Sequence, residues 1–208
     1  MTSFDLQLTL DVLGLHFIER GWLSANNSVF IGKRGPSAVV DTGYSTHAGQ
    51  TLELVKHALD GRSLDLVLNT HLHSDHCGGN AALAAAYPLS TTWIPPGQWE
   101  AVQRWDPVAL TYQPTGQECP RFLAHQRLIP GEEIQLGDWR WEIHGAPGHD
   151  PHSVVLYQPH QQCLISADAL WENGFGVVFP ELEGEEAFQE VAETLELIRT
   201  LEARIVIP

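Results

Sequence analysis

The sequence predicts an α+β fold in which β-sheets are covered by helices. Short stretches rich in apolar residues recur along the chain and are separated by turns, which is the pattern of strands. Longer segments such as residues 185–203 instead place apolar side chains along one helical face. With 208 residues, 43% of them apolar, the chain can bury a large core, and one domain over residues 1–208 is the simplest interpretation.

The first half of the chain predicts strands with one helix among them. Apolar residues alternate with polar ones from Phe4 to Val12, which is the period of a half-buried strand. The helix ends before Gly61, a residue type that suits a helix terminus. The elements expected, in chain order, are strands at residues 4–12, 28–31 and 38–40, a helix at 51–59 and a strand at 64–68.

The second half continues the mixture of helices and strands. Pro95 and Pro96 precede a short helix, and Gly137 and Pro159 mark turns between neighbouring strands. The elements expected, in chain order, are helices at residues 80–86 and 98–105, strands at 121–129, 133–135, 139–144, 153–157 and 162–166, a helix at 185–203 and a strand at 204–208.

The most distinctive segment is the run from Leu68 to Gly79, which holds three histidines and one aspartate within six residues. His71 and His73 follow a buried strand, and residues two apart in extended backbone point to the same side, so both can bind one cation. Asp75 and His76 follow in a turn, where they can face a second cation. A loop that is merely rich in histidine is the alternative, but this spacing between a strand and a glycine turn indicates a metal site.

Asp75 is also the candidate catalytic residue. Gly78 and Gly79 allow the chain to turn into the helix at residues 80–86. The dipole at a helix start favours the ionised form of Asp75, which is the form that binds a metal or accepts a proton.

Three further segments complete a known pattern. Asp41 follows the apolar strand at residues 38–40, His149 closes a Pro-Gly-His turn, and Asp168 follows an apolar strand that begins at Cys163. With the His-x-His-x-Asp-His run, these segments resemble the metallo-β-lactamase superfamily of metallohydrolases over most of the chain. The resemblance implies an αββα sandwich of two mixed β-sheets flanked by helices, with metal ligands on loops at one edge. Taken alone, each segment is an ordinary strand end or turn.

The resemblance also implies a role for each residue. Asp41 would brace the metal loop by hydrogen bonds, and Asp168 would bridge two metals through its two oxygens. His149 would complete the first site. The implied ligands are His71, His73, His149 and Asp168 for the first site, and Asp75, His76 and Asp168 for the second.

The second site is one ligand short of the family pattern. In this family the strand at residues 204–208 typically leads into Gly-His-Gly, whose histidine finishes that site, whereas the sequence stops at Pro208. We therefore expect the single metallo-β-lactamase-like domain to be incomplete at its C-terminus. The alternative is a chain that ends here naturally, with water, His47, His144 or His152 as the last ligand.

These residues predict a metal-dependent hydrolase. Zinc held by imidazole and carboxylate lowers the pKa of a bound water to about 7, and the resulting hydroxide attacks a carbonyl. The ligand set looks like that of glyoxalase II thioesterases and dinuclear lactonases, which implies a carbonyl ester, thioester or lactone as substrate. Two Zn²⁺ ions are expected in the full-length protein, with Mn²⁺ or Fe²⁺ as alternatives.

Two other functions stay open. Persulfide dioxygenases of this superfamily bind a single iron through two histidines and an aspartate, a set that His71, His149 and Asp168 can supply. A catalytically inactive binding module is the other alternative. Iron with oxygen consumption would favour the first, and a complete absence of turnover would favour the second.

Substrate contacts are predicted at two places. His152 follows His149 closely, so it either contacts substrate or lies on the surface. Trp171 and Phe175 lie in a glycine-containing loop just beyond the expected bridging aspartate, and loops at a metal edge carry specificity. The physiological substrate itself is not predicted.

Composition limits the partners. The net charge is −15, from 26 acidic and 11 basic residues, and no basic cluster is present to gather phosphates, which argues against nucleic acid. No apolar stretch is long enough to span a membrane, and the N-terminal residues lack the pattern of a signal peptide. We therefore expect a cytoplasmic protein with a small-molecule substrate and no membrane partner, while the oligomeric state is not predicted.

Three cysteines, Cys77, Cys119 and Cys163, are scattered along the chain. An odd and scattered set fits reduced thiols better than a disulfide framework. Cys77 lies beside His76, so it is either a group at the metal site or a small buried residue. The second interpretation is favoured because free cysteine is among the most buried residue types.

Overall fold

The structure is a computed structural model that describes residues 3–21, 24–182, 184 and 186–208. Contacts within the chain divide it into two compact units. The first unit comprises Met1–Arg127 and Gln135–Trp139, and the second comprises Leu128–Ile134 and Arg140–Pro208.

A six-stranded sheet forms the centre of the first unit, in the order β1-β2-β3-β4-β5-β6. Strands β1 to β3 are antiparallel neighbours, whereas β3 to β6 run parallel. Val40 of β3 pairs with Leu68 of β4, so Asp41 and Asn69, which follow these strands, lie at the same edge of the sheet. The strands are β1 (Leu15–Ile18), β2 (Asn27–Phe30), β3 (Ala38–Val40), β4 (Leu66–Leu68), β5 (Thr91–Ile94) and β6 (Gln126–Arg127).

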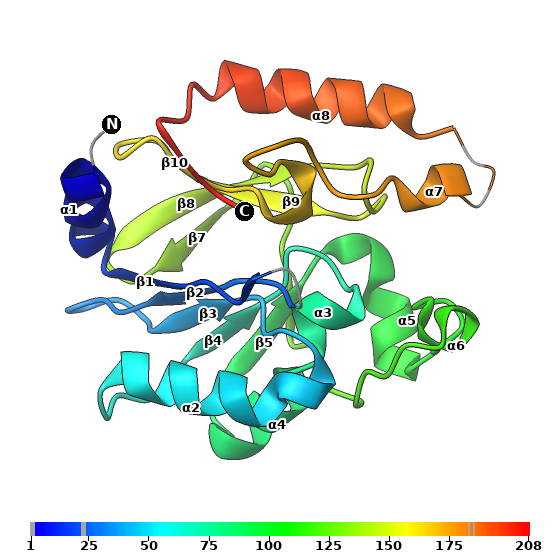
Figure 1. The fold of residues 1–208 in the computed structure, drawn as a ribbon. Coiled ribbons are helices and arrows are strands. Elements are labelled where there is room, and N and C mark those ends of the chain that lie inside the picture. The colour runs from blue at the N-terminus through cyan, green and yellow to red at the C-terminus, as the bar shows by residue number, and fades with distance from the viewer. Residues whose placement is uncertain (1–2, 22–23, 183, 185) are drawn as a thin grey trace. The chain divides into compact units, whose positions relative to one another are not determined.

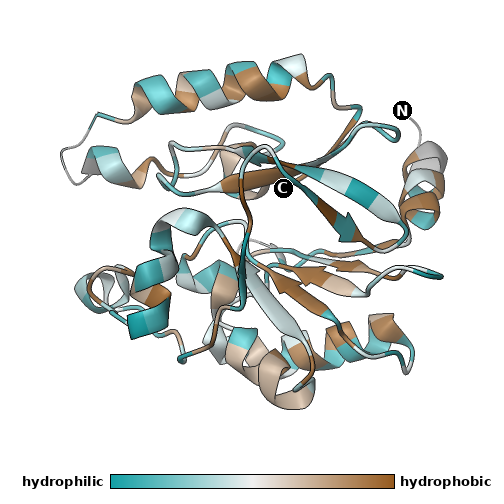
Figure 2. Cartoon of the chain, turned by 180° about the vertical axis from the view of Figure 1, so that it is seen from behind, coloured by the Kyte–Doolittle hydropathy of each residue, from teal (hydrophilic) through white to brown (hydrophobic). Residues whose placement is uncertain are grey.

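Helices α2 and α4 cover one face of this sheet (Figure 1). Val55 and Leu59 of α2 and Leu83 of α4 join Val39 and Val67 of the strands in one buried cluster. Figure 2 shows brown and teal stripes along α2, as expected for a helix with one buried face. The helices of this unit are α1 (Ser3–Leu13), α2 (Ala48–Leu59), α3 (Ser74–Cys77), α4 (Asn80–Ala86), α5 (Trp99–Arg104) and α6 (Tyr112–Thr115), with 3₁₀ turns η2 (Ser45–His47) and η3 (Pro96–Gln98).

The second sheet has the order β11-β10-β9-β8-β7. Strand β10 is parallel to β11 and antiparallel to β9. Helix α8 packs on this sheet through Ile198, in a buried cluster with Val155, Tyr157 and Leu164. The Tyr157 hydroxyl also donates a hydrogen bond to the carbonyl of Leu201, at 2.6 Å. The elements are β7 (Glu133–Leu136), β8 (Trp139–Gly145), β9 (Val154–Gln158), β10 (Cys163–Ile165), η4 (Ala167–Ala169), α7 (Phe179–Leu182), α8 (Phe188–Thr200) and β11 (Ile205–Ile207).

The predicted α+β class, with two mixed sheets and flanking helices, is confirmed. The helix expected at residues 80–86 has those bounds in the structure. The helix expected at 185–203 is shorter, at Phe188–Thr200, and its expected apolar face is only partly covered. Phe188 is 63% exposed, whereas Ile198 is buried.

The N-terminal segment is a helix, so the strand predicted there is wrong. Helix α1 spans Ser3–Leu13. Its alternating apolar residues do not share a buried face, because Leu8 and Val12 are exposed while Leu10 and Leu13 are buried. The buried pair is three residues apart, which is a helical spacing, and leucine is a favourable helix residue.

The strand predicted at residues 121–129 is also wrong over most of its length. Only Gln126–Arg127 pairs with the sheet, as β6. Phe122 and Ala124 are buried by packing into a side-chain cluster with Leu72 and Val102, so their apolar character reflects that packing. In the part of the chain that the structure describes, no helix is both long and apolar enough to cross a membrane.

Candidate metal centre

The metal loop, residues 69–80 from the end of β4 to the first residue of α4, brings three imidazoles together. His71 Nε2 lies 3.0 Å from His73 Nδ1, and the ring centroids of His71 and His76 are 3.9 Å apart. Two nitrogens bound to one tetrahedral zinc at about 2.0 Å lie about 3.3 Å from each other. The spacing between His71 and His73 is therefore suitable for a shared cation.

Asp41, which follows β3, orients His76. Its Oδ2 accepts hydrogen bonds from the Thr70 hydroxyl and from His76 Nδ1, each at 2.8 Å, and its Oδ1 accepts one from the Thr70 amide at 2.9 Å. Asp41 adopts a left-handed φ of 57°, which aspartate tolerates better than most residues. Because His76 Nδ1 donates to Asp41, His76 Nε2 retains the lone pair that a metal requires.

Asp75 lies in the short helix α3, next to His76. Its Oδ2 is 3.6 Å from His76 Nε2, and its side chain is 27% exposed, in contrast to the 3% of His76. The carboxylate is thus within reach of water as well as of the imidazole. The arrangement suits a group that contacts both a metal and a reacting water.

A buried polar network holds the metal loop, and the sequence pattern did not identify its members. The His76 carbonyl accepts hydrogen bonds from the Thr42 amide at 2.7 Å and from Asn69 Nδ2 at 2.9 Å. Asn80 Nδ2 in turn donates to Asn69 Oδ1 at 2.7 Å. A Cβ at Gly79 would come within 2.5 Å of the Thr42 carbonyl oxygen, so close packing explains this glycine. The sequence signal that could have identified this network was a polar residue directly after each of two buried strands.

In the second unit, His149 and Asp168 lie together. His149 Nε2 is 3.1 Å from Asp168 Oδ2, while His149 Nδ1 donates to the Val177 carbonyl at 2.6 Å. Trp171 Nε1 donates to Asp168 Oδ1 at 3.2 Å, and the Phe179 ring lies 5.4 Å from that of His149. As at His76, an oxygen that accepts the Nδ1 hydrogen leaves the lone pair of Nε2 available to a metal. Imidazole and carboxylate donors of this kind fit a divalent cation such as zinc.

The loop at residues 168–179 is tightly packed at Gly176, but several of its apolar side chains are exposed. We call these exposed apolar side chains the rim. The Gly176 amide donates to the Asp168 carbonyl at 2.8 Å, and a Cβ at Gly176 would come within 2.4 Å of His149 Nδ1. Four apolar side chains of this loop are nevertheless substantially exposed. They are Trp171 (42%), Phe175 (38%), Val177 (52%) and Phe179 (36%).

Two of the other histidines considered as ligands have their own local partners. His144 on β8 places Nε2 3.0 Å from Glu142 Oε2. His152 lies in a turn, where its backbone amide donates to Asp150 Oδ1 at 2.8 Å.

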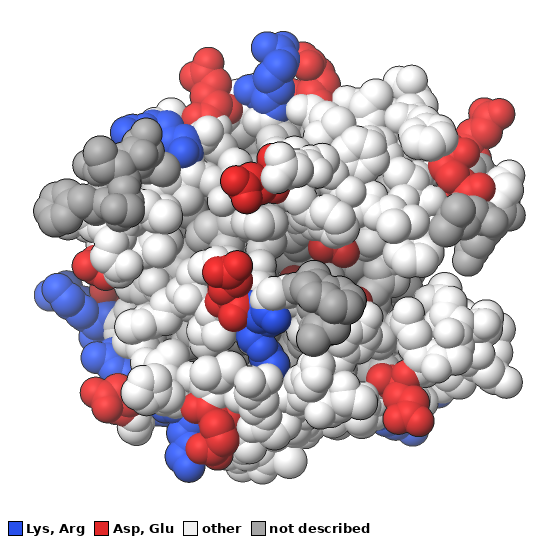
Figure 3. All heavy atoms as spheres, in the orientation of Figure 1, with Lys and Arg blue, Asp and Glu red and all other residues white. Residues whose placement is uncertain are grey.

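Charged side chains of both signs are spread over the face shown in Figure 3. Lys and Arg lie singly or in small groups there, among Asp and Glu. Exposed pairs such as Arg199 with Glu196, and Arg140 with Glu133, also place a cation next to a carboxylate. Such pairs lower the positive potential that a polyanion would need.

Comparison with known families gives a match over most of the chain. The model of the family described as "Metallo-beta-lactamase superfamily" matches residues 21–208. Among curated proteins, hydroxyacylglutathione hydrolase of Bdellovibrio bacteriovorus is 28% identical over 145 residues, which are 69% of this chain and 48% of that protein. The enzyme of the same name from Methylococcus capsulatus is 31% identical over 171 residues, or 81% of this chain and 54% of that protein. The chain spans about half the length of the curated relatives it matches.

Solved structures share the fold at low sequence identity. A metallo-beta-lactamase family protein from Thermus thermophilus matches with a TM-score of 0.72 and 20% identity, over 93% of this chain and 72% of that chain. The BLEG-1 B3 metallo-beta-lactamase gives a TM-score of 0.70 and 20% identity, over 88% and 83%. The protein TTHA1623, solved in a di-iron-bound form, gives a TM-score of 0.71 and 23% identity, over 93% and 90%.

Proposed function

The chain belongs to the metallo-β-lactamase superfamily, and from this membership we propose that its residues form the metal-binding part of a hydrolase for carbonyl esters, thioesters or lactones. The observation that carries the proposal is the convergence of His71, His73 and His76, with His76 Nδ1 held by Asp41. Buried imidazoles clustered in this way suit a divalent cation, because they offer it several neutral nitrogen donors.

The proposal includes the ligands of the second unit. We take His149 and Asp168 as ligands of the same centre, because the superfamily pattern implies them and because His149 Nδ1 is occupied by a carbonyl. The first site is then His71, His73, His149 and Asp168, and the second is Asp75, His76 and Asp168. Zinc is the metal proposed, with manganese or iron as alternatives; a structural neighbour that was solved with two irons makes iron worth testing.

The metals, when bound, supply a water of lowered pKa and polarise the substrate carbonyl. The residues of this chain perform the remaining tasks. Asp75 is partly exposed and beside His76 Nε2, so it accepts a proton or orients the attacking water. Asp41 keeps His76 in the tautomer with Nε2 free. Asp168 receives a hydrogen bond from Trp171, which fixes one of its two oxygens.

Thioesters are the substrate class we favour. The curated relatives carry the name hydroxyacylglutathione hydrolase, which describes cleavage of a glutathione thioester. We propose that Trp171 and Phe175 contact the acyl part of the substrate, because both are exposed apolar residues in the loop that begins at Asp168. His152 stays a prediction for substrate contact. The cytoplasmic location and the single domain over residues 1–208 likewise stay predictions.

Metal analysis together with turnover tests the proposal. Elemental analysis of the purified chain after incubation with zinc, manganese or iron should find bound metal, and the loaded protein should hydrolyse a hydroxyacyl thioester. His57, exposed on α2, provides a control in which an imidazole is removed away from the loop. A His71→Ala variant that kept the metal content of His57→Ala would contradict the proposal. A single iron with oxygen consumption on a persulfide would favour the oxygenase instead.

A further inference from the structure

Two cysteine thiols, one in the metal loop and one at residue 119, lie close together. Cys77 is the last residue of α3 and is fully buried, and its Sγ is 3.7 Å from Sγ of Cys119. Cys77 Sγ is also 3.1 Å from the Tyr112 hydroxyl oxygen, and that hydroxyl donates to the Leu72 carbonyl at 2.9 Å. The two sulfurs are therefore neighbours although they are 42 positions apart in the sequence.

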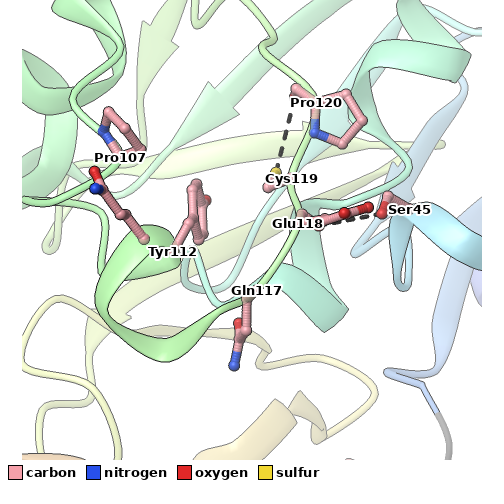
Figure 4. Close-up of a pocket in the computed structure, with 8 residues that line it drawn as sticks. Ser45, Pro107, Tyr112, Gln117, Glu118, Cys119 and Pro120 are labelled. Carbon is pink, nitrogen blue, oxygen red and sulfur yellow. Dashed lines mark hydrogen bonds between the residues drawn. The ribbon is translucent and has the colours of Figure 1, made fainter.

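Cys119 is the thiol that solvent can reach. It is half-buried and lines an open pocket of about 510 Å³ in the first unit. In Figure 4 the Tyr112 ring and Cys119 form part of the pocket wall, with Ser45 and Pro107 on opposite sides in this view. A small molecule that enters this pocket meets Cys119 before Cys77.

We propose that Cys77 and Cys119 form an oxidation-sensitive dithiol site that a small hydroperoxide converts to a disulfide. In the first step Cys119 sulfur attacks the peroxide O–O bond, which gives a sulfenic acid at Cys119 and releases one water from hydrogen peroxide. In the second step Cys77 sulfur attacks the sulfenic sulfur, which forms the S–S bond and releases the second water. Two thiols lose two hydrogens and two electrons, and the peroxide gains them.

The surroundings of the three cysteines support this order. The hydrogen bond from the Cys77 thiol lowers the pKa of Cys119, and a thiolate is the nucleophile toward peroxide. Burial raises the pKa of Cys163 to about 12, so the third thiol is a poor competitor. Closure requires the Cys77 and Cys119 sulfurs to approach from 3.7 Å to about 2.0 Å. Residues 117–121 have no regular secondary structure, so closure does not require a helix or strand to be broken in this segment.

The disulfide would reach the metal loop through Cys77. Cys77 Sγ lies 3.3 Å from the His73 carbonyl oxygen and 3.5 Å from that of Leu72, so closure, which moves this sulfur, changes its contacts with the backbone of the metal loop. It also draws the end of α3, which carries Asp75 and His76, toward residues 117–121. We expect the oxidised protein to bind zinc several-fold more weakly. The dithiol site itself concerns thiol chemistry and does not depend on which substrate the protein hydrolyses.

Peptide mapping after peroxide treatment tests the site. The full chain is treated with hydrogen peroxide, its remaining thiols are alkylated under denaturing conditions, and the digest is analysed by mass spectrometry. We expect a linked pair of peptides containing Cys77 and Cys119, two hydrogen atoms lighter than the two reduced peptides, and reversal by dithiothreitol. Cys163 should be alkylated. Absence of the link, or equal oxidation of Cys163, would overturn the proposal.

Three variants separate the steps. Cys119→Ser, a near-isosteric change at a half-buried position, should abolish the link, and Cys163→Ala should leave it unchanged. Cys77→Ser should stop the reaction at the Cys119 sulfenic acid, which dimedone then labels. Dimedone label at Cys163 in place of Cys119 would contradict the assigned order.

Zinc content is the readout for the effect on the metal loop. Peroxide should lower the zinc content of the wild-type protein, dithiothreitol should restore it, and Cys119→Ser should keep its zinc under the same treatment. Equal zinc loss in Cys119→Ser would show that the disulfide does not control the loop. These measurements need no turnover, so their failure is distinguishable from a failure of the hydrolase proposal.

Discussion

The metal loop at residues 69–80 and the loop at residues 168–179 both carry proposed metal ligands, but they are built differently. The first is enclosed by buried polar residues, since Asn69 and Asn80 are fully buried and Asp41 is 3% exposed. The second keeps its ligand close to exposed apolar residues, with Trp171 at 42% and Val177 at 52%. Rigid enclosure favours metal affinity, whereas an exposed apolar rim favours contact with a substrate. The contrast suggests that the two loops divide these tasks.

Removal of a ligand from the enclosed loop should have the largest effect. His71→Ala should lose metal at the first site and lower the hydrolytic rate by on the order of 10³-fold, because the metal supplies several kcal/mol of transition-state stabilisation. His149→Ala should behave in the same way if the second loop supplies its ligand to that site. Elemental analysis and initial rates measure both. His57→Ala, on the exposed face of α2, should retain metal and rate.

Substitution of Asp41, which holds His76 in the enclosed loop, should have the next largest effect. Asp41→Asn removes an acceptor from His76 Nδ1 and the Thr70 hydroxyl, so zinc affinity should fall by about 10–100-fold without loss of a ligand. A competition titration with a chromophoric chelator measures this affinity. Asp65→Asn is the matched control, since Asp65 accepts hydrogen bonds from Ser37 in the same unit, before β4. Equal affinities in the two variants would show that Asp41 does not act through His76.

The sequence predicted the parts of the site that depend on local spacing. The run with His71, His73 and His76 follows a strand and precedes α4 as expected, and these side chains do converge. The network of Thr42 and Asn80 escaped prediction, because it joins residues far apart in the chain that only the parallel β3–β4 pair brings together. Local pattern can indicate a candidate ligand, but it does not show which distant polar groups hold that side chain.

The two wrong strand predictions arose because periodicity alone does not show how an apolar side chain is buried. The alternation from Phe4 to Val12 is compatible with a strand, yet the pairing of Leu10 with Leu13 against the core is helical. At residues 121–129 the apolar residues fill a side-chain cluster and do not form a ladder. Apolar residues report that a side chain is buried, and only tertiary contacts decide which element buries it.

A substitution that disturbs the packing of Gly79 in the enclosed loop should have a smaller effect. This effect should be on stability and not on rate. Gly79→Ala would place a Cβ 2.5 Å from the Thr42 carbonyl oxygen, so the free energy of unfolding should fall by about 1–3 kcal/mol. Gly49→Ala is the matched control, because a Cβ there meets nothing within 4 Å and Gly49 lies in α2. That control should gain about 0.5–1 kcal/mol. Urea denaturation followed by circular dichroism distinguishes the two signs.

Substitution of an apolar side chain on the exposed rim should have the smallest effect, and this effect should be confined to substrate recognition. Phe175 is 38% exposed, so its removal forfeits only part of an apolar contact, of about 1 kcal/mol or roughly fivefold in kcat/KM. Phe175→Ala should therefore raise KM for a thioester with a long apolar acyl chain and leave zinc content unchanged. Leu89→Ala, at a residue 93% exposed in the first unit, controls for loss of a surface apolar side chain. If Phe175→Ala lowered zinc content instead of raising KM, the loop at residues 168–179 would belong to the metal-holding structure, and the proposed division between the two loops would be wrong.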